Sequence, residues 1–213
     1  MIQKILAFIS FTIIINTYAQ TTYNFDYRLD INNEHSNHSI KNNKINMSYL
    51  FNSKNPNYIL YLYPGNHGQI SDYEKNIARR FNYFTDLNNK TTYQFTQHLR
   101  FRPTDEIKIN NIVVEKIGEN KYSIKCYPRK KSKNVNLELE VHLKPYSEDF
   151  IKFYYLDLSQ NIHEKLTNSL KEKLNGNYNY IIDHYTVDYK NGAISTDTLE
   201  KIEKINLKIA PQD

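Results

Sequence analysis

Asn134–Lys144 reads NVNLELEVHLK, and this stretch decides the fold class. Its apolar residues occupy every second position, and polar or charged residues occupy the positions between them. Successive side chains of a β-strand point to opposite faces, so this period of two predicts a strand with one face in a core and the other in water. An antiparallel sheet with a core on one face is therefore the expected framework.

Similar alternation recurs along most of the chain and predicts about ten to twelve strands, separated by turns that contain Gly, Pro or Asn. Residues 32–43 (NNEHSNHSIKNN) are polar and are expected to form a loop. The expected strands are 23–30, 45–51, 58–63, 70–73, 76–84, 92–102, 111–117, 121–127, 134–144, 150–156, 178–189 and 201–209.

One helix is expected between Ser159 and Leu174, because apolar residues recur there every four positions. Ser159 suits the N-cap, and Asn175-Gly176 suits the end of the helix. A sheet of so many strands curls instead of staying flat. The predicted fold is therefore mainly β (α+β): a curved antiparallel sheet or unclosed β-barrel, with about one long helix covering it.

The first 19 residues read as a signal peptide. Lys4 precedes the apolar run 5–15, and Thr17-Tyr18-Ala19 supplies small residues before a cleavage point after Ala19. The run of about 11 residues is shorter than the roughly 20 that cross a bilayer as a helix. Residues 20–213 are expected to form a single β-rich domain without a transmembrane segment. No cysteine lies at the cleavage point, so we expect release into the periplasm, association with the outer membrane, or secretion.

The net charge, the single cysteine and one basic run bear on the partners and the compartment of this protein. The formal net charge of +5 is a mild excess without the dense clustering of nucleic-acid-binding proteins, so no nucleic-acid partner is expected. Cys126 is the only cysteine and is expected to be a small buried residue. The one dense basic run either is simply solvated or contacts anionic headgroups or lipopolysaccharide phosphates. It comprises Arg129, Lys130, Lys131 and Lys133.

The order of these features resembles exported proteins of Bacteroidetes-type bacteria that have the layout of the LolA/LolB lipoprotein-carrier group. The resemblance rests on the signal peptide, the antiparallel meander, the late helix and a closing segment, Tyr185-x-x-x-Tyr189-x-Asn191-Gly192 followed by LEKIEKI at 199–205. It implies an unclosed β-barrel with helical cover, whose concave apolar face accepts acyl chains.

Motifs for chemistry are weak, and no catalytic residue, cofactor or metal site is expected. His35 and His38 share a polar stretch, but two ligands fall short of the three or four that a zinc site uses. Asp183-His184 would orient an imidazole in a hydrolase, yet no Gly-x-Ser-x-Gly nucleophile elbow accompanies it. The sequence therefore favours a protein without enzymatic activity, but it leaves an enzyme open as an alternative.

The leading interpretation is an exported envelope binding protein that holds an apolar or acyl ligand without chemistry, with lipid or lipoprotein acyl chains as partners. The candidate residues of the cavity wall are apolar residues of two strands, which otherwise form ordinary core. They are Tyr93, Phe95, Leu99, Leu137, Leu139 and Val141. Two alternatives stay open: a structural or interaction module that binds envelope proteins, and a secreted hydrolase.

Overall fold

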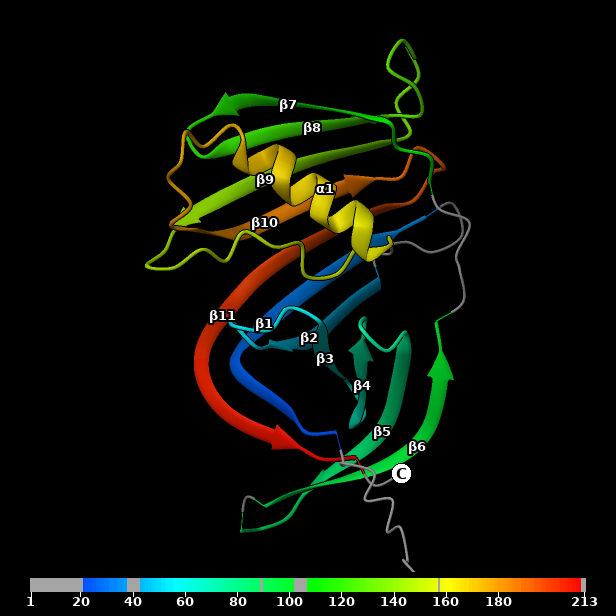
Figure 1. The fold of residues 1–213 in the computed structure, drawn as a ribbon, viewed down its shortest axis with the longest axis vertical. Helices are drawn as coiled ribbons and strands as arrows, with labels where there is room; N and C mark the ends of the chain where they lie inside the picture. The colour runs from blue at the N-terminus through cyan, green and yellow to red at the C-terminus, as the bar shows by residue number, and fades with distance from the viewer. Residues whose placement is uncertain (1–20, 38–42, 89, 102–106, 157, 212–213) are drawn as a thin grey trace, which may run out of the picture.

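A computed structural model describes residues 21–37, 43–88, 90–101, 107–156 and 158–211. These residues form one sheet of eleven strands and one α-helix (Figure 1). The expected signal peptide and its cleavage point lie outside the described residues. The elements are β1 (Tyr23–Ser36), β2 (Asn43–Phe51), β3 (Tyr58–Tyr63), β4 (His67–Asp72), β5 (Ile77–Thr85), β6 (Thr91–Arg100), β7 (Asn111–Gly118), β8 (Lys121–Tyr127), β9 (Leu137–Pro145), α1 (Gln160–Lys171), β10 (Tyr180–Asp188) and β11 (Ile194–Ile209).

The strand order is β6-β5-β4-β3-β2-β1-β11-β10-β9-β8-β7, and every neighbouring pair is antiparallel. The first and last strands therefore meet in the middle of the sheet, where Tyr23 pairs with Ile209 and Ser36 with Ile194. Among the described strands, β6 and β7 end the sheet on opposite sides and do not pair with each other. The predicted class, an unclosed antiparallel sheet with a single helix, is confirmed.

The sheet bends along its two longest strands. The pairing of β1 with β11 shifts register between Phe25 and Tyr27, and again between Asp30 and Ile31. Such irregularities bend a strand and increase its twist. Figure 1 shows the result: β1 and β11 curve, α1 lies over the half formed by β7–β10, and the half formed by β3–β6 curls around the other side.

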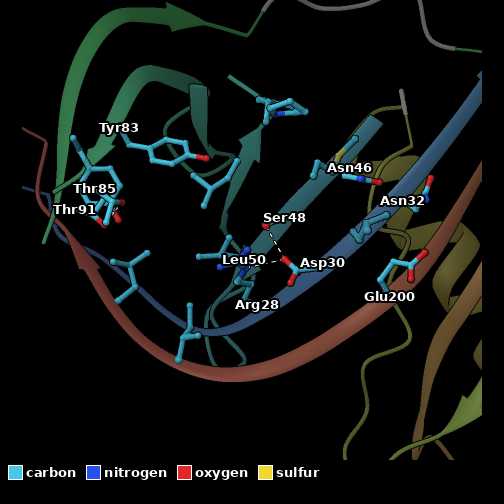
Figure 2. Close-up of a pocket in the computed structure, with 18 of the residues that line it drawn as sticks. Arg28, Asp30, Asn32, Asn46, Ser48, Leu50, Tyr83, Thr85, Thr91 and Glu200 are labelled. Atoms are coloured by element: carbon cyan, nitrogen blue, oxygen red, sulfur yellow. Dashed lines mark hydrogen bonds and ion pairs between the residues drawn. The ribbon is translucent and has the colours of Figure 1, made fainter. Parts of the chain in front are cut away.

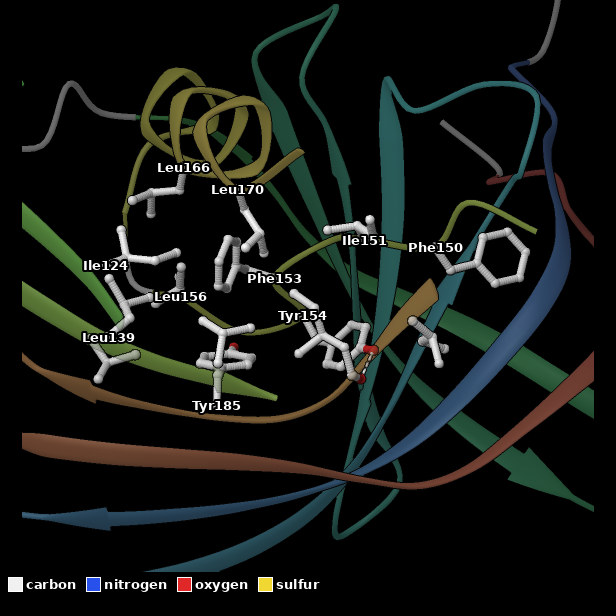
Figure 3. Close-up of a cluster of buried hydrophobic side chains, with 14 of the residues drawn as sticks. Ile124, Leu139, Phe150, Ile151, Phe153, Tyr154, Leu156, Leu166, Leu170 and Tyr185 are labelled. Atoms are coloured by element: carbon white, nitrogen blue, oxygen red, sulfur yellow. Dashed lines mark hydrogen bonds between the residues drawn. The ribbon is translucent and has the colours of Figure 1, made fainter. Parts of the chain in front are cut away.

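The larger core lies between α1 and the sheet. Leu166 and Leu170 are fully buried on the sheet-facing side of α1, beside Ile124 and Leu139 of the strands (Figure 3). A smaller core on the other face of the sheet includes Phe25, Leu50, Leu60 and Phe81. The space between α1 and β7–β10 is therefore filled by side chains.

The predicted helix is confirmed, but it is shorter than expected. α1 begins at Gln160 and ends at Lys171, and the left-handed residue Gly176 (φ 83°) follows after a turn. Ser159 occupies the N-cap position as predicted, but its side chain makes no capping hydrogen bond. Packing of the apolar face, rather than the cap, therefore stabilises this helix.

The strand predicted at 150–156 is wrong. This segment makes a single parallel bridge, between Phe150 and Ile181, and otherwise crosses the face of the sheet as irregular chain. Both edges of β10 are already occupied by β9 and β11, so the segment has no edge with which to pair. Its apolar side chains, including Phe153 and Tyr154, instead fill the core beneath α1.

The loop predicted at 32–43 is wrong in its first half. β1 continues to Ser36, and Asn32 and Asn33 are buried within it. Asn33 Nδ2 donates hydrogen bonds to Ser195 Oγ (2.8 Å) and Asp197 Oδ1 (2.9 Å) of β11. Hydrogen-bonded polar pairs thus take the place of the apolar alternation on which the prediction relied.

Candidate functional site

A groove lies between α1 and the strands β2–β4. It consists of two adjoining depressions of about 210 Å³ and about 1160 Å³, which share Pro56, Tyr61, Tyr73, Gln160 and Glu164. We call the two together the helix-side groove. It runs along the sheet beside the packed core under α1, and its volume suits an organic ligand.

Tyrosines form the sheet wall of the helix-side groove. Tyr49, Tyr61 and Tyr63 come from β2 and β3, and Tyr73 follows β4. The ring centroids of Tyr49 and Tyr61 are 5.4 Å apart, and those of Tyr61 and Tyr63 are 6.0 Å apart. Tyr155 packs edge-on against Tyr61 at 5.8 Å. Tyr61 and Tyr63 are stacked, whereas Tyr49 and Tyr155 meet Tyr61 edge-on, so the wall presents both faces and edges of aromatic rings.

Burial keeps these phenols neutral. It raises the pKa of Tyr49, Tyr61 and Tyr63 well above the ordinary value, and it raises the pKa of Tyr73 to about 12. Tyr61 donates its hydroxyl hydrogen to the carbonyl of Tyr154 at 2.9 Å, which holds its ring in place. The wall is thus uncharged across the physiological range of pH.

A single lysine enters the smaller depression. The ammonium nitrogen of Lys152 lies 5.0 Å from the centre of the Phe51 ring, and the side chain lines the same depression as Tyr49 and Phe153. Burial, and secondarily the positive charge of Lys171, lower the pKa of Lys152. Asp149 is paired with Lys171 at 2.6 Å, and among the described residues no carboxylate forms an ion pair with Lys152. A partly buried cation is therefore available to an anionic group in the groove.

The helix side of the smaller depression is polar. His163 Nε2 donates to the carbonyl oxygen of Leu156 at 3.1 Å, which ties α1 to the irregular segment before it. Burial lowers the pKa of His163. Gln160 and Glu164 lie on the same side, and their side chains are 3.5 Å apart. One wall of the groove is therefore aromatic and the other carries hydrogen-bonding groups.

A buried carboxyl lies behind the groove. Asp197 of β11 is fully buried and accepts a hydrogen bond from Asn33, a residue of the groove wall. Its second oxygen, Oδ2, has no hydrogen-bond partner in the part of the chain that the structure describes. Burial raises the pKa of Asp197 to about 7, and the hydrogen bond from Asn33 and the nearby Tyr185 hydroxyl offset this only in part.

The six residues predicted for a cavity wall fall into two separate groups. Leu137, Leu139 and Val141 of β9 are buried in the packed core under α1. Tyr93, Phe95 and Leu99 lie on β6, at the edge of the sheet. Tyr93 and Phe95 pack against Phe81 of the smaller core, whereas Leu99 is exposed. The structure does not bring the two groups together, and none of the six lines the helix-side groove.

The tyrosines of the helix-side groove were not among the residues predicted for a cavity wall. A local signal was present nonetheless. Tyr49 with Phe51, and Tyr61 with Tyr63, stand two positions apart in consecutive expected strands, so each pair shares one face. Aromatic residues stacked across neighbouring strands in this way predict an aromatic wall.

The basic run lies in the loop between β8 and β9, which projects from the helix-bearing half of the sheet (Figure 1). Arg129, Lys130, Lys131 and Lys133 are all exposed. The prediction that they contact an anionic surface stays a prediction.

The residues considered for hydrolysis do not form a catalytic arrangement. His184 Nδ1 lies 3.2 Å from Asp183, but its ring stacks on His142 at 3.9 Å, and no hydroxyl or thiol of the described residues is hydrogen-bonded to it. Cys126 is fully buried as predicted, and burial raises the pKa of its thiol to about 12. Neither residue is placed as an activated nucleophile or its base. His35 is the second-to-last residue of β1, and His38 lies outside the described residues.

Comparison with known proteins gives the following. No family model matches the sequence, and no curated protein matches it. Among solved structures, a LolA superfamily protein from Nitrosomonas europaea is similar with a TM-score of 0.37 and 6% identity, over 86% of this chain and 87% of that chain. A DUF1329 family protein from Desulfovibrio piger is similar with a TM-score of 0.34 and 8% identity, over 84% and 85% of the two chains. The expected LolA-like layout thus has a LolA superfamily protein among its structural neighbours, but likenesses this distant carry no argument about function.

The described residues have neither a membrane-spanning helix nor a metal-binding cluster. Among them, no helix has the length and apolar character to span a membrane. The same residues contain no group of three or more His, Cys, Asp or Glu side chains placed to hold a metal ion.

Proposed function

We propose that this protein is an exported envelope binding protein that holds an amphiphile with an acyl chain and an anionic end in the helix-side groove. The observation that carries the proposal is the partly buried Lys152, which lies at the aromatic end of the groove and forms no ion pair among the described residues, although the charges of Asp149 and Asp26 act on it from a distance. The acyl chain lies along the tyrosine wall, and the ligand carboxylate pairs with the Lys152 ammonium. The protein performs no chemistry on the ligand.

The physical case rests on complementarity. Ring faces of Tyr49, Tyr61 and Tyr63 offer apolar surface, and burial of methylene groups gives about 0.8 kcal/mol each. A charge that is already partly desolvated loses little further hydration when it meets an anion.

Binding is tested with protein freed of bound lipid by unfolding and refolding. Lys152→Met keeps the length and apolar stem of the side chain but removes its charge. We expect it to weaken palmitate binding by about tenfold or more, since hydrogen bonds to charged groups contribute about 1.5–3 kcal/mol. The affinity for hexadecanol, which lacks the carboxylate, is expected to stay unchanged. The measurement is titration calorimetry.

Lys165→Met is the matched control, because Lys165 is an exposed lysine of α1 that does not line the groove. It is expected to bind palmitate as the original protein does. Equal palmitate affinity in Lys152→Met and the original protein would refute the role of Lys152. Failure of both palmitate and hexadecanol to bind would refute the groove as an acyl site.

Export is part of the same proposal. Expression in a Gram-negative host and sequencing of the mature N-terminus are expected to give Gln20 as the first residue. A protein found in the cytoplasm with Met1 in place would contradict the envelope location.

One observation favours the second candidate, an interaction module of the cell envelope. The edge strand β6 has no Asp, Glu, Lys or Arg from Thr91 to Leu99, and proline is absent as well. Natural sheets usually protect an edge with such residues. Leu99 of β6 is exposed at this edge, and Phe84 is exposed on the neighbouring strand β5. A partner protein could add a strand to β6 and so join this protein to an envelope complex. Crosslinking through Gln97→Cys tests this role: a crosslinked partner supports the interaction module, whereas an acyl carrier needs no partner at β6.

A further inference from the structure

A second cavity opens on the face of the sheet opposite α1. It has a volume of about 930 Å³ and is bounded by β1, β2 and β11 on one side and by β3, β5 and β6 on the other (Figure 2). We call it the opposite-face cavity. Its volume falls in the range of small-molecule sites. The sheet lies between it and the helix-side groove, and Tyr63 of β3 is in the lining of both.

A polar stripe forms the floor of the opposite-face cavity. Arg28, Asp30 and Asn32 alternate along β1 and face the cavity together, spanning about 13 Å at the rise of a β-strand. Asp30 Oδ1 accepts a hydrogen bond from Ser48 Oγ at 2.7 Å and another from Arg28 Nε at 2.8 Å (Figure 2). Asn46, directly opposite Asn32 on β2, extends the stripe. The floor therefore presents a row of oriented donors and acceptors.

One of these acceptors is buried without a partner. The side chain of Asn32 is part of the cavity lining, the residue is only 8% exposed, and its Oδ1 accepts no hydrogen bond from the residues that the structure describes. A buried amide oxygen without a donor costs about 1–3 kcal/mol, so such atoms are rare in folded proteins. The oxygen is shielded from solvent, so a hydroxyl or N–H group of a ligand would satisfy it once the Asn32 amide turns into the cavity.

The walls are apolar and partly aromatic. Tyr83 and Tyr93 are directly opposite each other on β5 and β6, and the ring of Phe81 packs against both, at 6.4 Å and 5.4 Å. Leu50 and Leu62 add aliphatic surface. Ring faces beside rows of hydrogen-bonding groups suit a ligand whose own surface has both C–H faces and hydroxyl edges.

The lining of the cavity has two basic residues, Arg28 and Lys44, and two acidic ones, Asp30 and Glu200. Arg28 is paired with Asp30 on the floor, and Lys44 at the rim lies 3.3 Å from Glu34. Glu200 is the remaining acidic residue of the lining. No excess of positive charge is present to hold a phosphate or carboxylate, so the cavity favours a neutral ligand.

From these observations we infer that the opposite-face cavity is a second binding site, which takes a short neutral oligosaccharide. Sugar hydroxyls occupy the stripe from Arg28 to Asn32, with one of them donating to Asn32 Oδ1, and sugar rings lie against Tyr83 and Tyr93. This inference is independent of the acyl ligand proposed for the helix-side groove.

The decisive variant is Asn32→Leu, which replaces the amide by an apolar group of similar size. Three probes are used: maltotriose, cellotriose and N,N′,N″-triacetylchitotriose, each at millimolar concentration, with saturation-transfer NMR as the readout. We expect at least one of them to bind the original protein and to bind Asn32→Leu about tenfold more weakly or worse. The midpoint of thermal unfolding is expected to stay the same or rise, because removal of an unsatisfied buried acceptor relieves a cost.

Asn24→Leu is the matched control, since Asn24 is an exposed residue of the same strand outside the cavity. It is expected to bind the sugar normally. Three results would each overturn the inference: no binding of any probe, unchanged binding by Asn32→Leu, or displacement of the sugar by palmitate. Palmitate binding by Asn32→Leu is expected to be normal, which separates the fate of this site from that of the helix-side groove.

Discussion

Replacing Asp197 by asparagine is expected to change how the stability of this protein depends on pH. Asp197 is fully buried, and among the described residues only the side chains of Asn33 and Tyr185 stabilise its carboxylate. Ionising it in the folded state therefore places a poorly compensated charge in the interior. Asp197→Asn keeps the shape of the side chain and an oxygen that accepts from Asn33, but it cannot ionise.

The size of the effect follows from the pKa. Burial raises the pKa of Asp197 from 3.8 to about 7, a difference of about 3 units, and each unit corresponds to about 1.4 kcal/mol, which gives about 4 kcal/mol. Below pH 3.8 the carboxyl is protonated in both states. Between 3.8 and 7 only the unfolded chain releases the proton, so the free energy of unfolding falls as the pH rises, and above 7 the loss is complete.

The assay is urea unfolding at pH 4 and pH 8, followed by circular dichroism. The stability of Asp197→Asn relative to the original protein is expected to increase by about 4 kcal/mol between these two values, since all other titrating groups are common to both proteins. Asp188→Asn is the control. Its carboxylate has a lowered pKa because of Lys190, so its removal is expected to give a small change of opposite sign. Parallel pH profiles for Asp197→Asn and the original protein would refute the reasoning.

Three further predictions concern packing and surface. In Gly68→Ala the new Cβ would overlap the Phe81 ring, so we expect the free energy of unfolding, measured with urea, to fall by about 1–3 kcal/mol. An unchanged free energy of unfolding would contradict this packing. The buried thiol of Cys126 is expected to react with a thiol reagent only as fast as the protein unfolds; rapid reaction in native buffer would show that it is accessible. Neutralising Lys130 and Lys131 by substitution with glutamine is expected to weaken binding to phosphatidylglycerol vesicles by about 1 kcal/mol per residue, and high salt should remove this difference. If the variant and the original protein sediment equally with vesicles at low salt, a surface contact is contradicted.

Much of the fold could be predicted from periodicity. Residues 137–143 alternate without interruption, and β9 forms there with the expected face buried. The helix is likewise found where apolar residues recur at its spacing. The prediction failed where tertiary context replaced the local pattern: 150–156 has strand-like composition but no free edge, and Asn33 is buried because Ser195 and Asp197, distant in sequence, supply its partners.

The candidate site was less predictable than the fold. Alternation with a period of two shows which residues of a strand share a face of the sheet, but it does not show which part of that face the helix covers. Val141 and Tyr61 both alternate with polar or aliphatic neighbours, yet the first lies under α1 and the second lines the open groove. The difference depends on where one short helix rests on a wide sheet, and on Lys152, which reaches the groove from an irregular segment that periodicity misassigned.

The alternation of β1 has a consequence for how this strand can vary between related proteins. Asn33 lines the helix-side groove, and its neighbour Asn32 lines the opposite-face cavity. Insertion or deletion of one residue before this point would exchange the two linings, turning each polar side chain to the wrong side of the sheet. A change of length in this part of β1 would therefore disturb the linings of both cavities. We expect related proteins to keep the length of β1 even where its residues differ.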